Sequence, residues 1–167
     1  KEATVHMRQG TVPPILPATP PLDGEPGTLA DGNVGEIGDL DMRAFGSNRE
    51  KVLALLAEDS SIVTLRRGGE IVGYSMCREF GRGRVIGPMV ARNDQDAIHL
   101  TAAHLRNLPG QFVRVDTREM DGAFIEFLQQ SGLDVDDTVT TMSKGRRFLN
   151  PRDHAPRVYG LAGHALS

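Results

Sequence analysis

Apolar and polar positions along the chain alternate between the two-residue period of strands and the longer period of helices. Two β-rich runs at residues 61–66 and 70–78 are joined by Arg67-Gly68-Gly69, which is a hairpin turn signal. A third run follows the glycines at 81 and 83. The pattern therefore predicts one mixed α/β sheet. Its strands are expected at residues 62–65, 71–78, 84–90, 112–115 and 133–142.

Four amphipathic segments between these runs predict helices. Residues 34–45 have apolar positions at helical spacing and stop at Gly46, and a second helix begins after Ser47 or Asn48 and ends near residue 58. Residues 94–108 form a wide apolar face before Pro109-Gly110, and residues 121–131 precede Gly132. The expected order is therefore two helices, a three-stranded meander, helix, strand, helix, strand.

The two ends of the chain differ from this central domain. Residues 3–9 alternate like a strand but have no hairpin partner nearby, so they are expected to pair with a sheet other than the main one, or to lie loose. Residues 11–33 are rich in proline and glycine and are interpreted as a linker or a disordered leader. We assign the domain to residues 34–145, and residues 146–167 to a tail with weak helical character.

The most informative interruption is Gly87-Pro88 in the third strand of the meander. A proline has no N–H to donate to a strand ladder, so within a sheet it requires a bulge or a local parting of strands. A parting leaves backbone groups free to meet a ligand, which makes the helix that follows at residue 94 the place to look for function.

Composition excludes several classes of function. The chain has 167 residues, a net charge of −3 and no long basic run, and the basic cluster at residues 144–147 is short, which argues against nucleic-acid binding. Its single cysteine, Cys77, suits a reducing cytoplasm. No apolar run approaches the roughly 20 residues that span a bilayer. His99 and His104 are too far apart on one helix to share a metal, so no metal is expected.

The order of elements and several motifs resemble the Gcn5-related N-acetyltransferase (GNAT) fold, over most of the chain. These motifs are residues 41–49 (DMRAFGSNR), 69–74 (GEIVGY), 86–88 (IGP), 124–132 (FIEFLQQSG) and 142–145 (MSKG). The resemblance implies an N-acetyltransferase that moves an acetyl group from acetyl-CoA to a small amine or amino-acid-like acceptor.

More narrowly, the chain resembles the C-terminal half of bacterial tandem acetyltransferases that contain two GNAT-like domains. On this interpretation residues 5–10 (VHMRQG) are the closing strand of a preceding GNAT domain. That domain would be the partner that binds most of the acetyl-CoA, and the present domain would supply walls for the acceptor.

The cofactor-binding motif of the family is only partly present. The resemblance places acetyl-CoA against the strand of Pro88, Met89 and Val90, with Arg92 offering a phosphate contact. The family follows this strand with a glycine-rich turn whose amides hold the pyrophosphate. Here residues 92–97 read RNDQDA, without glycine and with two carboxylates that repel a pyrophosphate. Asn93 or Asp94 is better suited to cap the helix, so this chain alone is expected to bind acetyl-CoA weakly or not at all.

Three further positions are candidates for the acceptor side. Asp116, at the end of a strand, could orient or deprotonate an ammonium, or it could cap the turn into Arg118. Asp41, Phe45 and Arg49 could line an acceptor cleft, and Asp41 with Arg49 could equally form a local ion pair. If the acceptor lies between two domains, Asp116 and Asp41 should face that cleft.

A second class of function fits the same residues. A GNAT-like domain without a phosphate-binding turn could be a catalytically silent interaction or ligand-sensing module. The loop at residues 92–96 favours this alternative for the chain alone, whereas the family resemblance favours an acetyltransferase for the whole protein.

Overall fold

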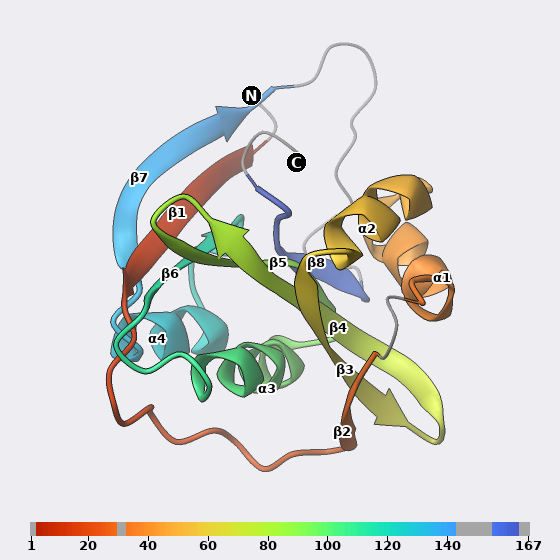
Figure 1. The fold of residues 1–167 in the computed structure, drawn as a ribbon, viewed down its shortest axis with the longest axis horizontal. Coiled ribbons are helices and arrows are strands. Elements are labelled where there is room, and N and C mark those ends of the chain that lie inside the picture. The colour runs from red at the N-terminus through yellow and green to blue at the C-terminus, as the bar shows by residue number, and fades with distance from the viewer. Residues whose placement is uncertain (1–2, 30–32, 143–154, 164–167) are drawn as a thin grey trace.

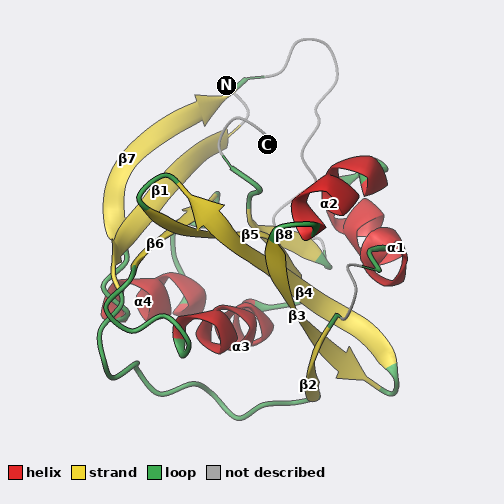
Figure 2. Ribbon diagram, viewed as in Figure 1, coloured by secondary structure: helices red, strands yellow, loops and turns green. Residues whose placement is uncertain are grey.

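A single mixed sheet organises the chain, and helices cover both of its faces (Figures 1 and 2). The structure is a computed structural model that describes residues 3–29, 33–142 and 155–163. Its helices are α1 (Gly35–Phe45), α2 (Glu50–Ala57), α3 (Asp94–Leu105) and α4 (Ala123–Gln130). Its strands are β1 (Ala3–Thr11), β2 (Glu25–Thr28), β3 (Ser60–Arg67), β4 (Glu70–Phe80), β5 (Gly83–Ala91), β6 (Phe112–Thr117), β7 (Asp134–Thr141) and β8 (Arg157–Gly160).

The five predicted strands belong to one sheet, as expected. The order is β2-β3-β4-β5-β6-β1-β7, and β8 pairs with β5 off this path. All pairings are antiparallel except β5 with β6, which is parallel. The hairpin between β3 and β4 turns at Gly68 and Gly69, which both have positive φ, as the sequence predicted.

Two hydrophobic cores lie on opposite faces of the sheet. One core packs α3 and α4 against the sheet and includes Leu100, Phe124 and Leu128. The other packs α1 and α2 and includes Ile37 and Leu53. Successive residues of β5 point to opposite faces, as the pleat of a strand requires, so Met89 belongs to the first core and Val90 to the second.

The expectation that residues 3–9 pair outside the main sheet is wrong, and the interpretation of residues 5–10 as the closing strand of a preceding domain loses its local support. β1 lies between β6 and β7, where Val5 is fully buried and Met7 faces Asp116 of β6. Gly10 permits this close packing, since a Cβ there would lie 1.9 Å from the carbonyl oxygen of Gly132. The outer edge is instead taken by β7, whose side chains are mostly exposed and include three aspartates.

The predicted boundaries of the linker and the tail also need correction. Residues 25–28 of the linker form β2, which pairs with β3, and Leu16 packs against the α3–α4 core. In the tail, residues 157–160 are a strand rather than a weak helix. Strand propensity prevails here because an unpaired edge of β5 is available to this segment. Residues 143–154 and 164–167, including most of the motif at 142–145, lie outside the described part.

Helix α3 is fixed to the sheet partly by a buried histidine, which predicts a pH dependence of stability. The Nε2 atom of His104 lies 2.9 Å from Ser75 Oγ, and burial lowers the pKa of His104 to about 4. The unfolded chain protonates this histidine near 6.5, so the folded state binds fewer protons between pH 6.5 and 4. Stability should therefore fall by about 3 kcal/mol as the pH falls through this window.

Urea unfolding of the wild type and of His104→Gln at pH 7, 5.5 and 4 measures this contribution. The carboxylates titrate in both proteins, so the difference between the two stability curves isolates His104. Parallel curves would show that His104 is not buried in its neutral form.

Candidate functional site

The candidate site begins where β5 and β6 separate. These parallel strands pair at Arg84 with Val113 and at Val85 with Arg114, and their pairing ends there. On the other side of β5, the register with β4 shifts across Gly87-Pro88. Both the bulge and the parting that the proline predicted are therefore present.

The gap between the separated strands is filled by β8. Met89 pairs with Gly160, Val90 with Val158 and Ala91 with Arg157. Beyond β8, the N–H of Leu161 donates a hydrogen bond of 2.8 Å to the carbonyl of Asp116 in β6. The segment thus bridges β5 and β6 and uses the backbone groups that a ligand in this gap would need.

Tyr159 anchors β8 in the α3–α4 core. Its side chain is fully buried, and its ring meets that of Phe124 edge to face at 5.3 Å. Its hydroxyl donates a 2.8 Å hydrogen bond to Asp94 Oδ1 at the start of α3. Burial, and then the bond to Asp94, raise the pKa of Tyr159, so the hydroxyl stays protonated and can donate.

The loop before α3 is occupied by its own side chains. Asn93 caps the helix by accepting a hydrogen bond from the N–H of Asp96 at 2.9 Å, as the sequence predicted. Asp94 Oδ2 accepts the N–H of Phe124 in the first turn of α4 at 3.1 Å. The carboxylate of Asp96 is buried and bound by both terminal nitrogens of Arg67, at 2.9 and 2.6 Å.

Acetyl-CoA therefore does not fit this gap as the chain is folded. The predicted contacts Pro88, Met89 and Val90 are buried, and the strand edge of the last two is paired with β8. Arg92 is exposed at the entrance to the loop. At the start of α3, the side chain of Asn93 already accepts the N–H of Asp96, and the carboxylates of Asp94 and Asp96 would repel a pyrophosphate.

Asp116 lies at the inner edge of this gap, but its side chain does not face solvent. The carboxylate is fully buried and forms a bidentate pair with Arg114, at 2.7 and 2.8 Å. The two residues are two positions apart on β6, so their side chains share one face of the strand. The expectation that Asp116 faces an open cleft is therefore not met, and its catalytic role stays a prediction.

Asp41, Phe45 and Arg49 come together on the face of the sheet that α1 and α2 cover. Asp41 is 1% exposed and is held by two nitrogens of Arg49, both at 2.8 Å. The guanidinium of Arg49 lies 3.9 Å from the centre of the Phe45 ring. The local ion pair is therefore present and is more deeply buried than a surface pair, while a role in acceptor binding stays a prediction.

Tyr74 completes this cluster, and the sequence analysis gave it no role. Its hydroxyl donates to Asp41 Oδ1 at 2.5 Å, and burial followed by the charge of Asp41 raises its pKa well above the usual value. Tyr159 was missed as well, although the apolar run at residues 158–161 is a short strand signal that could have found it.

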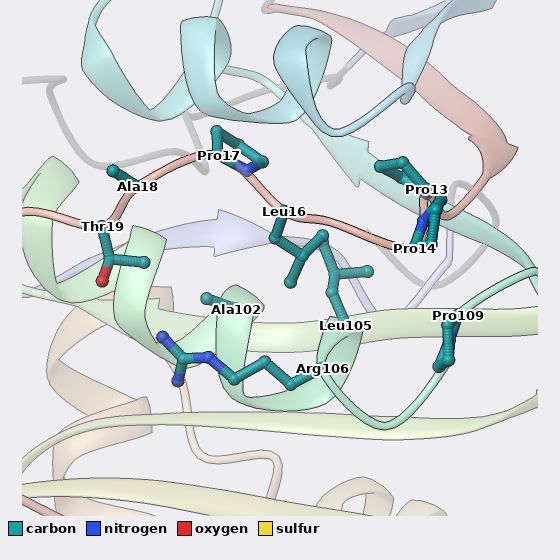
Figure 3. A pocket seen from close by; sticks show the side chains of 10 residues that line it. All are labelled: Pro13, Pro14, Leu16, Pro17, Ala18, Thr19, Ala102, Leu105, Arg106 and Pro109. Carbon is teal, nitrogen blue, oxygen red and sulfur yellow. The ribbon is translucent and has the colours of Figure 1, made fainter.

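A separate hollow of about 400 Å³ lies between the proline-rich segment and the end of α3 (Figure 3). Figure 3 shows Leu16 directed toward Leu105, and the guanidinium of Arg106 extends along the floor. The hollow is lined by Pro13, Pro14, Leu16, Pro17, Ala18, Thr19, Ala102, Leu105, Arg106 and Pro109. Its lining includes no residue of β5, β6 or β8 and no carboxylate.

The described residues show neither a metal-binding cluster nor a membrane-spanning helix. Within residues 3–29, 33–142 and 155–163, no three His, Cys, Asp or Glu side chains are grouped so that they could hold a metal ion. None of the four helices described above is long and apolar enough to cross a membrane.

The architecture is shared with solved acetyltransferase structures. A candidate acetyltransferase from Pyrococcus horikoshii superposes with a TM-score of 0.71 at 17% identity, covering 99% of this chain and 52% of its own. A candidate GNAT-family acetyltransferase from Novosphingobium aromaticivorans gives 0.59 at 12% identity, with 81% and 61% covered. A GCN5-related N-acetyltransferase from Sphaerobacter thermophilus gives 0.54 at 19% identity, with 81% and 49% covered.

The sequence itself matches a family model described as an acetyltransferase (GNAT) domain over residues 37–160. The chain therefore belongs to the GNAT family of acetyltransferase domains. It spans between about half and three fifths of the length of the three structures named above. No curated protein matches the sequence.

Proposed function

We propose that this chain is the acceptor-side GNAT-like domain of an N-acetyltransferase, and that a preceding GNAT domain holds most of the acetyl-CoA. In the reaction, the nitrogen of an amine attacks the thioester carbonyl of acetyl-CoA. The new C–N bond replaces the C–S bond and CoA leaves as a thiolate. A base or water takes the proton that the amine loses, and a proton returns to the thiolate to give the thiol of CoA.

The observation that carries this proposal is the filled gap in a domain that belongs to an acetyltransferase family. Family membership supports acetyl transfer. The pairing of β8 with Met89 and Val90 supports a cofactor site in another domain. The partial coverage of the P. horikoshii structure is consistent with a second unit of similar size.

Acetyl transfer by the complete natural polypeptide tests the proposal. Radiolabelled acetyl-CoA is incubated with a panel of small amines and amino acids, using either the complete polypeptide or the present chain. We expect transfer by the complete polypeptide and none by the present chain. Two results would contradict the proposal that a preceding domain binds acetyl-CoA and this chain binds the acceptor. One is acetyl transfer by the present chain alone, and the other is a preceding domain that does not bind acetyl-CoA.

Asp116 provides a residue-level prediction within this proposal. If its carboxylate orients the acceptor ammonium, Asp116→Asn in the complete enzyme should raise the acceptor KM by about 10- to 100-fold, because a charge-assisted hydrogen bond is lost. The KM for acetyl-CoA should not change. Steady-state kinetics with each substrate varied separately measures both effects.

The control is Asp136→Asn, which changes an exposed carboxylate on β7. Since Asp116 is paired with Arg114, the stability of Asp116→Asn is measured in parallel and kinetics are recorded well below its unfolding temperature. A folded variant with an unchanged acceptor KM would reduce Asp116 to a structural partner of Arg114.

The same filled gap favours a second candidate, a catalytically silent GNAT-like interaction or ligand-sensing module. Here the domain retains the fold but takes no part in acetyl transfer. The two candidates differ in the complete polypeptide: the silent module predicts that Asp116→Asn alters neither KM nor kcat. Ligand-induced shifts in melting temperature of the present chain, screened with amino acids and amines, would then identify what the module recognises.

A further inference from the structure

The segment at residues 157–162 forms backbone hydrogen bonds with both strands at the parting of β5 and β6. On one side it pairs with three residues of β5, and on the other it donates from Leu161 to the carbonyl of Asp116. An extended ligand in such a gap would gain its affinity from these same backbone groups. The chain's own segment thus forms the backbone hydrogen bonds that an extended ligand in the gap would form.

Asp94, the first residue of α3, links β8 to the first turn of the neighbouring helix α4. The first turn of a helix attracts anions through its free N–H groups. Here the carboxylate of Asp94 accepts the N–H of Phe124 in α4 and the hydroxyl of Tyr159 in β8. Arg157 of β8 lies 3.5 Å from the same carboxylate and 3.4 Å from Glu119, so β8 is tied to the loop by charge as well.

The surrounding core is shaped to hold this segment. Gly87 has no side chain at the point of closest approach, since a Cβ there would lie 1.9 Å from the carbonyl oxygen of Leu161. Arg78 donates to the carbonyls of Gly87 and Ala162 and so bridges the bulge to the segment. Leu161 and Ala162 are buried almost completely. Removing the segment would leave Arg78 and Asp94 with fewer partners and would expose the core around them.

We propose that residues 157–162 are a permanent internal occupant of this gap, held there by their pairing with β5 and by the bonds of Tyr159 and Arg157 to Asp94. A strand of the domain itself occupies the place where a ligand would bind, and this strand does not leave the gap to admit acetyl-CoA. This inference goes beyond the proposed function, because it holds whether the domain lines an acceptor cleft or is catalytically silent.

A reversible lock on β8 tests the inference in the present chain. Val90 and Val158 face each other across β5 and β8, so the double variant Val90→Cys/Val158→Cys can join the two strands by a disulfide. Glu25→Cys/Arg66→Cys, which joins β2 to β3 away from the gap, is the matched control. Calorimetry with acetyl-CoA and with CoA is run on each protein, oxidised and reduced.

We expect no micromolar binding by the wild type or by either reduced variant, and no change when the disulfides form. Binding that the Val90–Val158 disulfide abolishes, that reduction restores and that the control disulfide leaves intact would overturn the inference, because β8 would then be a gate. Binding that persists with the lock closed would place the cofactor elsewhere on the chain and would support a permanently filled gap.

Hydrogen exchange of the unmodified chain provides a second readout that needs no variant. The amides of β8 and of Leu161 should exchange as slowly as those of the central strand β4, with or without acetyl-CoA. Exchange of β8 that is much faster than that of β4, or that accelerates when acetyl-CoA is added, would show that the segment leaves the gap.

Discussion

Replacing Tyr159 with alanine is expected to lower the free energy of unfolding by about 3–5 kcal/mol, which is the usual cost of deleting a fully buried aromatic ring. The ring is completely buried, packs edge to face on Phe124, and lies in the main core rather than at the rim. Its loss would leave a cavity between α4 and the sheet. Chemical denaturation followed by circular dichroism measures the effect directly.

Tyr159→Phe is the matched control because it keeps the ring and removes only the hydroxyl. It should cost about 1–3 kcal/mol, since Asp94 loses a partly buried hydrogen-bond donor. A near-neutral effect of Tyr159→Ala would mean that β8 rests on the surface instead of completing the core. That result would also weaken the case for a permanently filled gap.

Asp41→Ala should have a comparable effect, with a loss of about 3–5 kcal/mol, because removing one partner of a buried ion pair leaves the other charge uncompensated. The carboxylate is the shared acceptor of Arg49 and Tyr74, and Arg49 is only 7% exposed. The variant leaves a buried guanidinium and a buried hydroxyl without their acceptor. Thermal and urea unfolding of the purified variant measure the loss.

Asp39→Ala, two residues earlier on α1, is the matched control because its carboxylate is exposed. It should change stability by no more than about 0.5 kcal/mol. Equal effects of the two substitutions would show that the Asp41 pair is solvated and only weakly stabilising. In that case Asp41 and Arg49 would be free to meet an acceptor, as the sequence alone allowed.

Local periodicity determined most of the helices and strands, because each depends on which side chains face the core. The spacing of apolar residues in 94–108 indicated α3. The helix ends at Leu105, about one turn before the predicted end at residue 108. The hairpin at Gly68 and Gly69 and the disruption at Gly87-Pro88 were also readable, since both depend on backbone limits of single residues. The same holds for the absence of glycine at residues 92–97, which predicted a capped helix rather than a phosphate-binding turn.

The tertiary structure alone decided where the two ends of the chain pair. Residues 3–9 were predicted to be strand-like, whereas the segment of β8 was assigned weak helical character. The groups that choose the neighbours of both strands are backbone N–H and C=O groups, which nearly every residue carries. Only the folded sheet shows that one free edge lies beside β6 and another beside β5. For the same reason Asp94, Asp116 and Asp41 could be named as carboxylates from the sequence, whereas their partners, Tyr159, Arg114 and Tyr74, became known from the fold. Burial and pairing depend on contacts between distant segments, and these turned a predicted cofactor gap into one that the chain fills itself.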